Sequence, residues 1–173
     1  LWRIYGVRRP PPFRPTHVLL DFDGVLTDNA VLLSQDGVES VRCHRGDGAG
    51  IAALKAAGIV VAIISKERNP VVTARARKLD VPVHQAVDDK AQLLRDTFGD
   101  ALATSVFVGN DLNDLGAMAT VGFAVAPQDA VDDVLDAADW VLSRNGGQGA
   151  VRELADLLLQ PDATQSSQKR SPS

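Results

Sequence analysis

The chain has 173 residues, about one domain's worth, and its 45% hydrophobic and 23% charged residues exclude a disordered, collagen-like or coiled-coil chain. No stretch approaches the roughly 18 uninterrupted apolar residues of a membrane span, and the net charge of −4 argues against non-specific nucleic-acid binding. Its one cysteine, Cys43, excludes an internal disulfide and a multi-cysteine metal cage, which fits a reducing cytoplasm. From these three observations we expect a cytoplasmic protein without membrane or nucleic-acid partners.

The two ends of the chain differ in composition from the middle. Residues 1–15 are basic and rich in proline, which prevents a continuous helix or a central strand, so they predict an arm or linker. Residues 161–173 have no apolar periodicity and predict a disordered tail. One domain is therefore expected over residues 16–160.

Within that domain, short apolar runs alternate with segments of helical spacing. The expected strands are 18–20, 59–64, 81–87, 105–108, 122–125 and 140–142. The expected helices are 49–57, 70–79, a segment capped by Asp88 and Asp89 that runs to about Phe98, 111–118, 130–137 and 150–159. This alternation is typical of βαβ units, so we predict an α/β fold with a Rossmann-like, doubly wound parallel sheet.

The segment after the first strand breaks this alternation. Apolar residues at 31–33 and 38–41 flank Gln35-Asp36-Gly37, and Asp-Gly between apolar runs indicates a hairpin. We therefore expect a β-hairpin inserted directly after the first strand. A lone hairpin is marginal in water, so its apolar residues need something to pack on: Val31, Leu32, Leu33, Val38 and Val41.

Polar residues follow four of the predicted strands, at the edge where a doubly wound sheet binds its ligands. Asp21 and Asp23 follow the first strand, Ser65 the second, and Lys90 comes soon after the third. The fourth is followed by Gly109-Asn110-Asp111-Leu112-Asn113-Asp114. We expect one crevice lined by Asp21, Asp23, Ser65, Lys90 and Asp111.

The residue types in this crevice indicate phosphoryl transfer. Asp21 and Asp23 share a face of the chain, where two carboxylates repel unless a cation or a shared proton intervenes. Oxygen ligands without His or Cys suit Mg²⁺ rather than zinc. Ser65 and Lys90 can bind a dianion, although Ser65 alone also fits a helix cap and Lys90 alone a solvated side chain. Asp21 can act as the nucleophile that forms an aspartyl-phosphate, and Asp23 as general acid and then base.

These motifs, in this order, resemble the four motifs of the haloacid dehalogenase superfamily over about residues 17–159. They are Asp21-Phe22-Asp23-Gly24-Val25-Leu26-Thr27-Asp28, Ser65, Lys90 and Gly109-Asn110-Asp111-x-x-Asp114. The hairpin and residues 45–51 and 146–153 are similar to the small branch without a cap domain. That branch contains 3-deoxy-manno-octulosonate 8-phosphate phosphatase, nonulosonate 9-phosphate phosphatases and the C-terminal domain of some acylneuraminate cytidylyltransferases.

The resemblance implies roles for the residues of the crevice. Asp21 would be nucleophile and Mg²⁺ ligand, Asp23 the acid and base that binds the metal through its backbone carbonyl, and Ser65 and Lys90 the phosphoryl-binding residues. Many relatives have an aspartate as third metal ligand directly after the motif glycine, where this chain has Asn110. Either the amide oxygen of Asn110 or the carboxylate of Asp111 would take that place, and the loss of an anionic ligand should weaken Mg²⁺ binding.

The resemblance also implies a sugar-acid phosphate as substrate and a homotetramer with the hairpins at its centre. Glu67 could accept hydrogen bonds from sugar hydroxyls or an amino group, and Arg68 or Lys78 could meet a carboxylate. Glu67 with Lys78 looks more like the nonulosonate than the octulosonate phosphatases, although solvated helix charges fit equally. The expectation is a nonulosonate 9-phosphate phosphatase first and an octulosonate 8-phosphate phosphatase second.

Three other classes of protein fit the sequence less well or in part. A receiver domain places its paired acid at the first strand and its phosphoacceptor at a later one, and here the second strand ends in Ser65 with no acid. No Gly-x-Gly-x-x-Gly follows the first strand, which disfavours a dinucleotide-binding enzyme. A catalytically weak tetramerising domain associated with an acylneuraminate cytidylyltransferase stays open as the alternative function.

Overall fold

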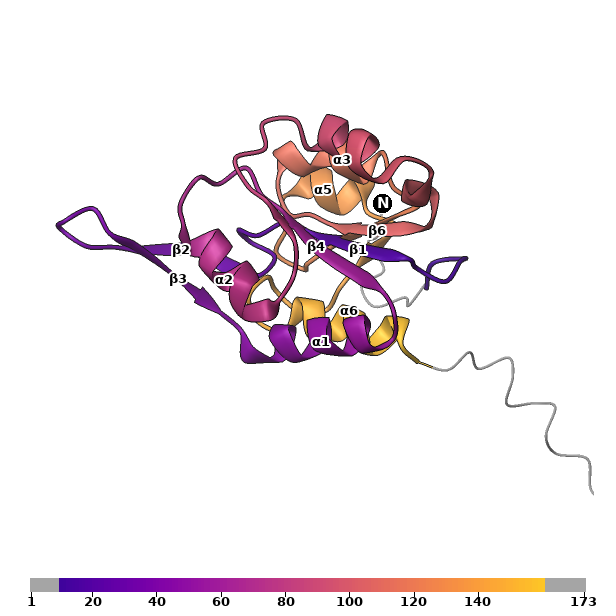
Figure 1. The fold of residues 1–173 in the computed structure, drawn as a ribbon, viewed down its shortest axis with the longest axis horizontal. Coiled ribbons are helices and arrows are strands. Elements are labelled where there is room, and N and C mark those ends of the chain that lie inside the picture. The colour runs from indigo at the N-terminus through magenta and orange to yellow at the C-terminus, as the bar shows by residue number, and fades with distance from the viewer. Residues whose placement is uncertain (1–9, 161–173) are drawn as a thin grey trace, which may run out of the picture.

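A six-stranded parallel sheet forms the centre of the chain, in a computed structural model that describes residues 10–160 (Figure 1). The predictions for residues 1–9 and 161–173 lie outside the described residues. The strand order is β5-β4-β1-β6-β7-β8, so the sheet grows outward in both directions from β1. The strands are β1 (His17–Leu20), β4 (Val60–Ile64), β5 (Val83–His84), β6 (Ser105–Val108), β7 (Phe123–Ala126) and β8 (Trp140–Val141).

Helices cover both faces of this sheet, which confirms the predicted doubly wound α/β fold. In Figure 1, α1 and α6 lie together below the sheet, whereas α3 and α5 lie above it. The helices are α1 (Arg45–Ala56), α2 (Val71–Leu79), α3 (Lys90–Phe98), α4 (Leu115–Met118), α5 (Asp132–Ala137) and α6 (Ala150–Leu158), with two 3₁₀ turns, η1 (Gly99–Thr104) and η2 (Leu112–Asp114).

The alternation of side chains along β1 divides the core into two layers. Val18 and Leu20 pack with Leu54 of α1 and Leu154 of α6, while Leu19 packs on the opposite face with residues of α3 to α5. All three β1 side chains are fully buried because helices cover both faces. This explains why the parallel strands appear in the sequence as continuous apolar runs rather than as alternating ones.

The inserted hairpin is present and forms a separate antiparallel pair, β2 (Thr27–Leu33) and β3 (Glu39–Cys43). It projects from the body of the domain (Figure 1), and its turn runs from Ser34 to Val38. Four of the five apolar residues expected to need a packing partner are exposed, between 55% for Val31 and 75% for Leu32. The exception is Val41, which is partly buried against the main core because β3 returns toward the domain there.

Several predicted boundaries were wrong, and local hydrogen bonding explains the larger differences. Helix α1 begins at Arg45 rather than Ala49, because His44 caps it by accepting a hydrogen bond from the amide of Gly46. The glycines in its first turn hide this start in the sequence. The expected helix 111–118 is η2 followed by α4, and the expected strand 81–87 pairs only at Val83–His84.

The described part of the proline-rich arm is not detached from the domain. The ring of Phe13 packs against the main core and Pro15 is buried. The arm lies against the end of α6, where Pro10–Pro15 and Leu157–Leu159 line a shared groove. No helix within residues 10–160 is long and apolar enough to cross a membrane.

Candidate active site

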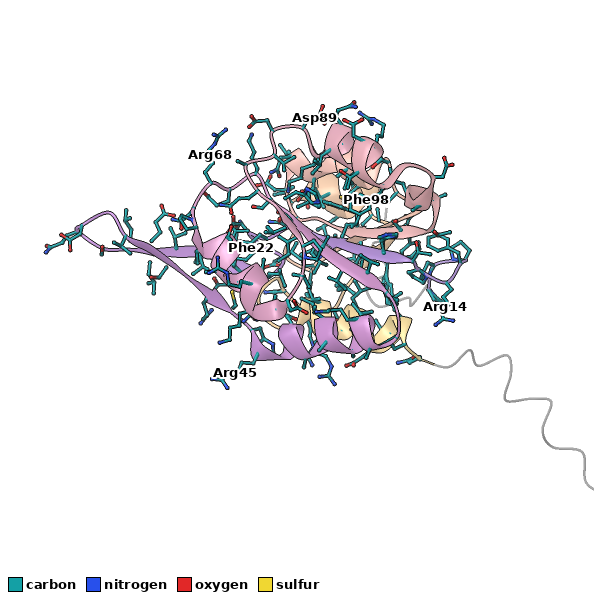
Figure 2. All side chains as sticks on the ribbon, viewed as in Figure 1. Arg14, Phe22, Arg45, Arg68, Asp89 and Phe98 are labelled. Carbon is teal, nitrogen blue, oxygen red and sulfur yellow. The ribbon has the colours of Figure 1, made fainter. Side chains whose placement is uncertain are left out.

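The carboxyl ends of β1, β4 and β6 meet at one pocket of about 330 Å³. The strand order reverses between β1 and β6, which is where doubly wound sheets bind ligands. Between the two motif aspartates, Phe22 turns into the core (Figure 2), so Asp21 and Asp23 are left on the side of the pocket. The lining residues are Asp21, Asp23, Asn29, Ser65, Lys66, Glu67, Arg68, Asn110, Asp111 and Asn113.

Lys90, the first residue of α3, was expected to line this pocket, but it lies beneath the pocket between two buried carboxylates. Its Nζ donates to Asp21 Oδ1 at 2.6 Å and to Asp114 Oδ1 at 2.7 Å. All three side chains are almost completely inaccessible, and that of Lys90 is 1% exposed. The ammonium group is thus held against the carboxylate that follows β1, although the two residues are 69 positions apart in the sequence.

Burial and charge shift the ionisation of this cluster. Burial, followed by the charge of Asp114, raises the pKa of Asp21 to about 7, and the Lys90 ammonium opposes this rise. Burial alone would lower the pKa of Lys90, but the two carboxylates outweigh it and raise that pKa. The lysine therefore stays charged, and any added positive charge near Asp21 will favour its ionised form.

Asp114 positions this cluster and was not among the predicted site residues. Its Oδ1 holds Lys90, and its Oδ2 accepts hydrogen bonds from the backbone amides of Asn110 (2.9 Å) and Asp111 (3.3 Å). One carboxylate thereby fixes both the lysine and the loop after β6. The available signal was its place in the fourth motif, Gly109-Asn110-Asp111-x-x-Asp114, whose Asp-x-x-Asp spacing is also that of the capping box found there.

The Asn110 amide lies beside the Asp23 carbonyl oxygen and Asp21 Oδ2 in a way that suits a divalent cation. The atom of the Asn110 amide that faces the pocket lies 2.8 Å from the backbone oxygen of Asp23 and 3.1 Å from Asp21 Oδ2. An oxygen in that position would be a third ligand of the cation, whereas a nitrogen would donate hydrogen bonds to both of the other oxygens. Octahedral Mg²⁺ with ligands at 2.0–2.1 Å has neighbouring oxygens about 2.9 Å apart, so the donor set fits this ion.

The same geometry places Asn110, but not the side chain of Asp111, beside Asp21 and Asp23. Asn110 is 6% exposed and faces Asp21 and Asp23, whereas Asp111 is exposed and its Oδ1 accepts from the amide of Leu112. No group of three or more His, Cys, Asp or Glu side chains that could hold a metal lies within residues 10–160. The candidate set draws instead on a backbone carbonyl, an amide and one carboxylate.

Asp23 and Ser65 lie at the open side of the cluster. Burial, and then the negative charges of Glu67 and Glu39, raise the pKa of Asp23, which Lys90 and a hydrogen bond from Thr27 oppose. Ser65 is buried at the end of β4, and its Oγ accepts a hydrogen bond from the amide of Glu67 at 3.0 Å. Its hydroxyl hydrogen stays available for a ligand in the pocket.

The predicted substrate residues divide into two groups. Glu67 and Arg68 line the pocket in the loop after β4, and Arg68 extends outward at its rim (Figure 2). Lys78 does not line it: it is exposed near the end of α2, seven residues and therefore about 10 Å along the helix from its start. Sequence reasoning missed Asn29, which the irregular start of β2 holds at φ +61° in the pocket wall.

A glycine loop supports the turn that carries Asp23. Gly146 packs so closely on this turn that a Cβ there would lie 1.8 Å from the carbonyl oxygen of Gly24. Glu153 holds the preceding residues through the amides of Ser143 and Arg144. These contacts explain why residues 146–153 carry a recognisable pattern although none of them lines the pocket.

Comparison with known proteins agrees with this geometry. No protein-family model matches the chain. The 3-deoxy-D-manno-octulosonate 8-phosphate phosphatase KdsC of Haemophilus influenzae is 35% identical over 147 residues, which cover 83% of this chain and 82% of the relative. The protein of the same name from Salmonella typhi is 36% identical over 147 residues, covering 82% and 78%.

Solved structures lead to the same family. A protein described as a HAD family hydrolase from Streptomyces avermitilis superposes with a TM-score of 0.84 and 46% identity, over 91% of each chain. The Moraxella catarrhalis 3-deoxy-D-manno-octulosonate 8-phosphate phosphatase, in complex with a magnesium ion, a phosphate ion and KDO, gives 0.80 and 31% over 84% and 86%. The predicted family and enzyme class are confirmed, and the chain belongs to the haloacid dehalogenase superfamily of phosphatases, in its 3-deoxy-manno-octulosonate 8-phosphate phosphatase-like branch.

Proposed function

We propose that this chain hydrolyses the phosphate monoester of a sugar acid in the presence of Mg²⁺, through a covalent phosphate on Asp21. The observation that carries the proposal is the contact of Lys90 with Asp21, beside the Asp23 carbonyl oxygen and the Asn110 amide. This arrangement puts a nucleophile next to fixed positive charge and a site for a cation. Phosphoryl transfer needs such positioning and charge compensation, and little else from the protein.

The first half of the reaction transfers the phosphoryl group to the enzyme. Asp21 Oδ attacks phosphorus, so that an Asp21–phosphate bond forms while the bond between phosphorus and the sugar oxygen breaks. Asp23 gives its proton to the departing alkoxide, and burial together with Glu67 and Glu39 raises the pKa of Asp23 toward the range in which it can carry one. When bound, Mg²⁺ supplies positive charge that favours ionised Asp21 and offsets the charge of the phosphoryl oxygens.

The second half returns the enzyme to its starting state. Asp23, now ionised, takes a proton from a water molecule whose oxygen attacks phosphorus. The Asp21–phosphate bond breaks, inorganic phosphate leaves, and Asp23 is protonated again. Ser65 lines the pocket with Asp21 and can hold the phosphoryl oxygens through both steps, while Lys90, beneath the pocket, supplies positive charge beside Asp21.

The rim of the pocket supports a polyhydroxylated acid as the rest of the substrate. Lys66 and Arg68 supply positive charge, and Asn29 and Asn113 supply donors and acceptors. Glu67 is partly committed, since its Oε1 already accepts from the backbone amides of Arg68 and Asn69. Because Lys78 is not in the pocket and the relatives are named for octulosonate 8-phosphate, we put that substrate first and nonulosonate 9-phosphate second.

The exposed hairpin supports a homotetramer as the working form. Val31, Leu32, Leu33 and Val38 are more than half exposed on a two-stranded ribbon, which is an unfavourable arrangement for a chain alone in water. A second copy would cover them. A catalytically weak tetramerising domain would also need this surface, so the hairpin does not distinguish the two functions and activity must.

Phosphate release with octulosonate 8-phosphate, nonulosonate 9-phosphate and an aryl phosphate tests the proposal. Asp21→Asn should abolish release from every substrate, because an amide cannot form the acyl phosphate. Asp23→Asn should lose about 10²–10⁴-fold on sugar phosphates and less on the aryl phosphate, whose leaving oxygen needs less protonation. Asp36→Asn, in the exposed hairpin turn, is the matched control.

Three outcomes would contradict parts of this proposal. Absence of Mg²⁺-dependent turnover on every sugar phosphate would favour the tetramerising domain. Near wild-type turnover by Asp21→Asn would exclude the covalent route. Equal impairment of Asp23→Asn on both kinds of substrate, with no trapped aspartyl-phosphate, would reduce Asp23 to a residue that positions the metal through its backbone.

A further inference from the structure

The Asn110 side chain occupies a position where its two amide atoms meet opposite surroundings. The atom that faces the pocket contacts two acceptors only, the Asp23 carbonyl oxygen at 2.8 Å and Asp21 Oδ2 at 3.1 Å. The other amide atom faces only hydrogen-bond donors. One orientation of the amide therefore satisfies both atoms by hydrogen bonds alone, and the other does so only if a cation lies among the oxygens.

The surroundings of this side chain restrict it to those two orientations. A Cβ on Gly24 would lie 2.0 Å from Asn110 Nδ2, so the amide packs closely against the bare backbone of that glycine. Asn110 is 6% exposed, and its own backbone amide is held by Asp114 Oδ2. The group has no room to swing away, but exchanging its oxygen and nitrogen changes its shape very little.

We propose that Asn110 turns its amide over when the metal binds. Without a metal, Nδ2 faces the pocket and donates to Asp21 and to the Asp23 carbonyl. With the metal, Oδ1 faces the pocket and is the third protein ligand. The proposal rests on the metal-dependent function above, and it makes Asn110 a positioning residue that holds the ligand set together in both states.

A carboxylate at position 110 could fill only one of these two roles. It would bind a cation more tightly, because ligand charge sets much of the affinity of an oxygen site. It could not donate to Asp21 or to the Asp23 carbonyl, and it would add a negative charge beside Asp21 when the metal is absent. An aliphatic group of the same shape could fill neither role.

Two substitutions separate the two orientations, each measured by thermal unfolding and by calorimetric titration with MgCl₂ alone. Asn110→Leu keeps the branched shape and should unfold several degrees below the wild type in EDTA, because it strands two acceptors. Asn110→Asp should also unfold below the wild type in EDTA. It should bind Mg²⁺ roughly tenfold to a hundredfold more tightly, so its unfolding temperature rises further on adding the metal. Asn113→Leu and Asn113→Asp, at the exposed neighbouring asparagine of the pocket, are the matched controls.

The possible results distinguish this proposal from the proposed function. If Asn110→Leu unfolds at or above the temperature of Asn113→Leu in EDTA, the oxygen faces Asp21 without metal and the amide does not turn over. If Asn110→Asp binds Mg²⁺ no more tightly than Asn113→Asp, Asn110 is not a ligand. Either result overturns this proposal while the metal-dependent function stands, whereas a wild-type chain that binds no Mg²⁺ overturns both.

Discussion

Replacing Lys90 with methionine should destabilise the protein far more than replacing any exposed lysine. Methionine retains most of the length of the side chain but removes the ammonium that donates to Asp21 at 2.6 Å and to Asp114 at 2.7 Å. Two carboxylates that are almost fully buried then face each other without a counter-charge. The variant isolates the charge of Lys90 from its packing.

The size of the effect follows from the burial of the cluster. Removing one partner of a buried ion pair costs about 3–5 kcal/mol, and a domain of this size loses about 2–4 °C per kcal/mol, so the unfolding temperature should fall by roughly 6–20 °C. The fall should increase as the pH rises above 7. Lys90 holds the pKa of Asp21 down at about 7, so without the ammonium Asp21 takes up a proton more readily, and at lower pH that proton relieves the repulsion. Lys78→Met, on the exposed side of α2, should change the temperature by no more than about 2 °C.

Differential scanning calorimetry at pH 8 in EDTA measures these differences directly. The double variant Lys90→Met/Asp114→Asn should regain part of the lost stability, since one of the two uncompensated charges is gone. If Lys90→Met melts within about 2 °C of Lys78→Met under these conditions, the ammonium does not lie between the two carboxylates in solution. The proposed phosphoryl-transfer mechanism would then lack the fixed positive charge beside Asp21 on which it depends.

Two further predictions concern the metal and the assembly. Since the pKa of Asp21 is raised from 3.8 to about 7, the proton stabilises the fold below pH 3.8 and this contribution is lost as the pH rises through 7. Mg²⁺ must displace that proton, so the apparent dissociation constant of Mg²⁺ should fall about tenfold per pH unit up to pH 7 and level off above it. Calorimetric titrations measure this dependence, and Asp21→Asn should not show it. For the hairpin, Leu32→Glu should convert a tetramer into smaller species in sedimentation equilibrium, whereas Gln35→Glu, in the adjacent turn, should not. A monomeric wild type at micromolar concentration would refute the assembly.

The fold and the position of several pocket residues could be predicted from the sequence because each depends on a local pattern. Buried parallel strands leave continuous apolar runs, and the residue directly after such a run lies at the ligand-binding edge whatever the rest of the chain does. Asp21 and Ser65 follow this rule, and Asn110 comes one residue later, after Gly109. Asp89 was predictable as a helix cap because capping also depends on a local pattern, and it accepts a hydrogen bond from the amide of Gln92 at 2.9 Å.

The remaining features depend on contacts between distant segments, which no local pattern encodes. Gly146 is confined to glycine by a carbonyl that lies more than a hundred positions earlier, at Gly24. Asp114 has the spacing of a cap, and only the approach of Lys90 from α3 gives it a second partner. Lys78 shows the opposite kind of error: the sequence predicted that it binds the substrate, but it lies near the end of α2, away from the pocket.

The charges of the buried cluster explain what a neutral residue at position 110 does to the site. Two carboxylates, Asp21 and Asp114, and one ammonium, Lys90, give the cluster a net charge of −1. A divalent cation changes this to +1, a suitable surrounding for the dianionic phosphate of a substrate. A carboxylate in place of Asn110 would bring the loaded cluster to zero, so it would hold the cation more firmly and the phosphate less firmly. Under the proposed function, the amide would shift affinity from the metal to the phosphoryl group, and its hydrogen-bond donors would keep Asp21 and Asp23 together when no cation does so.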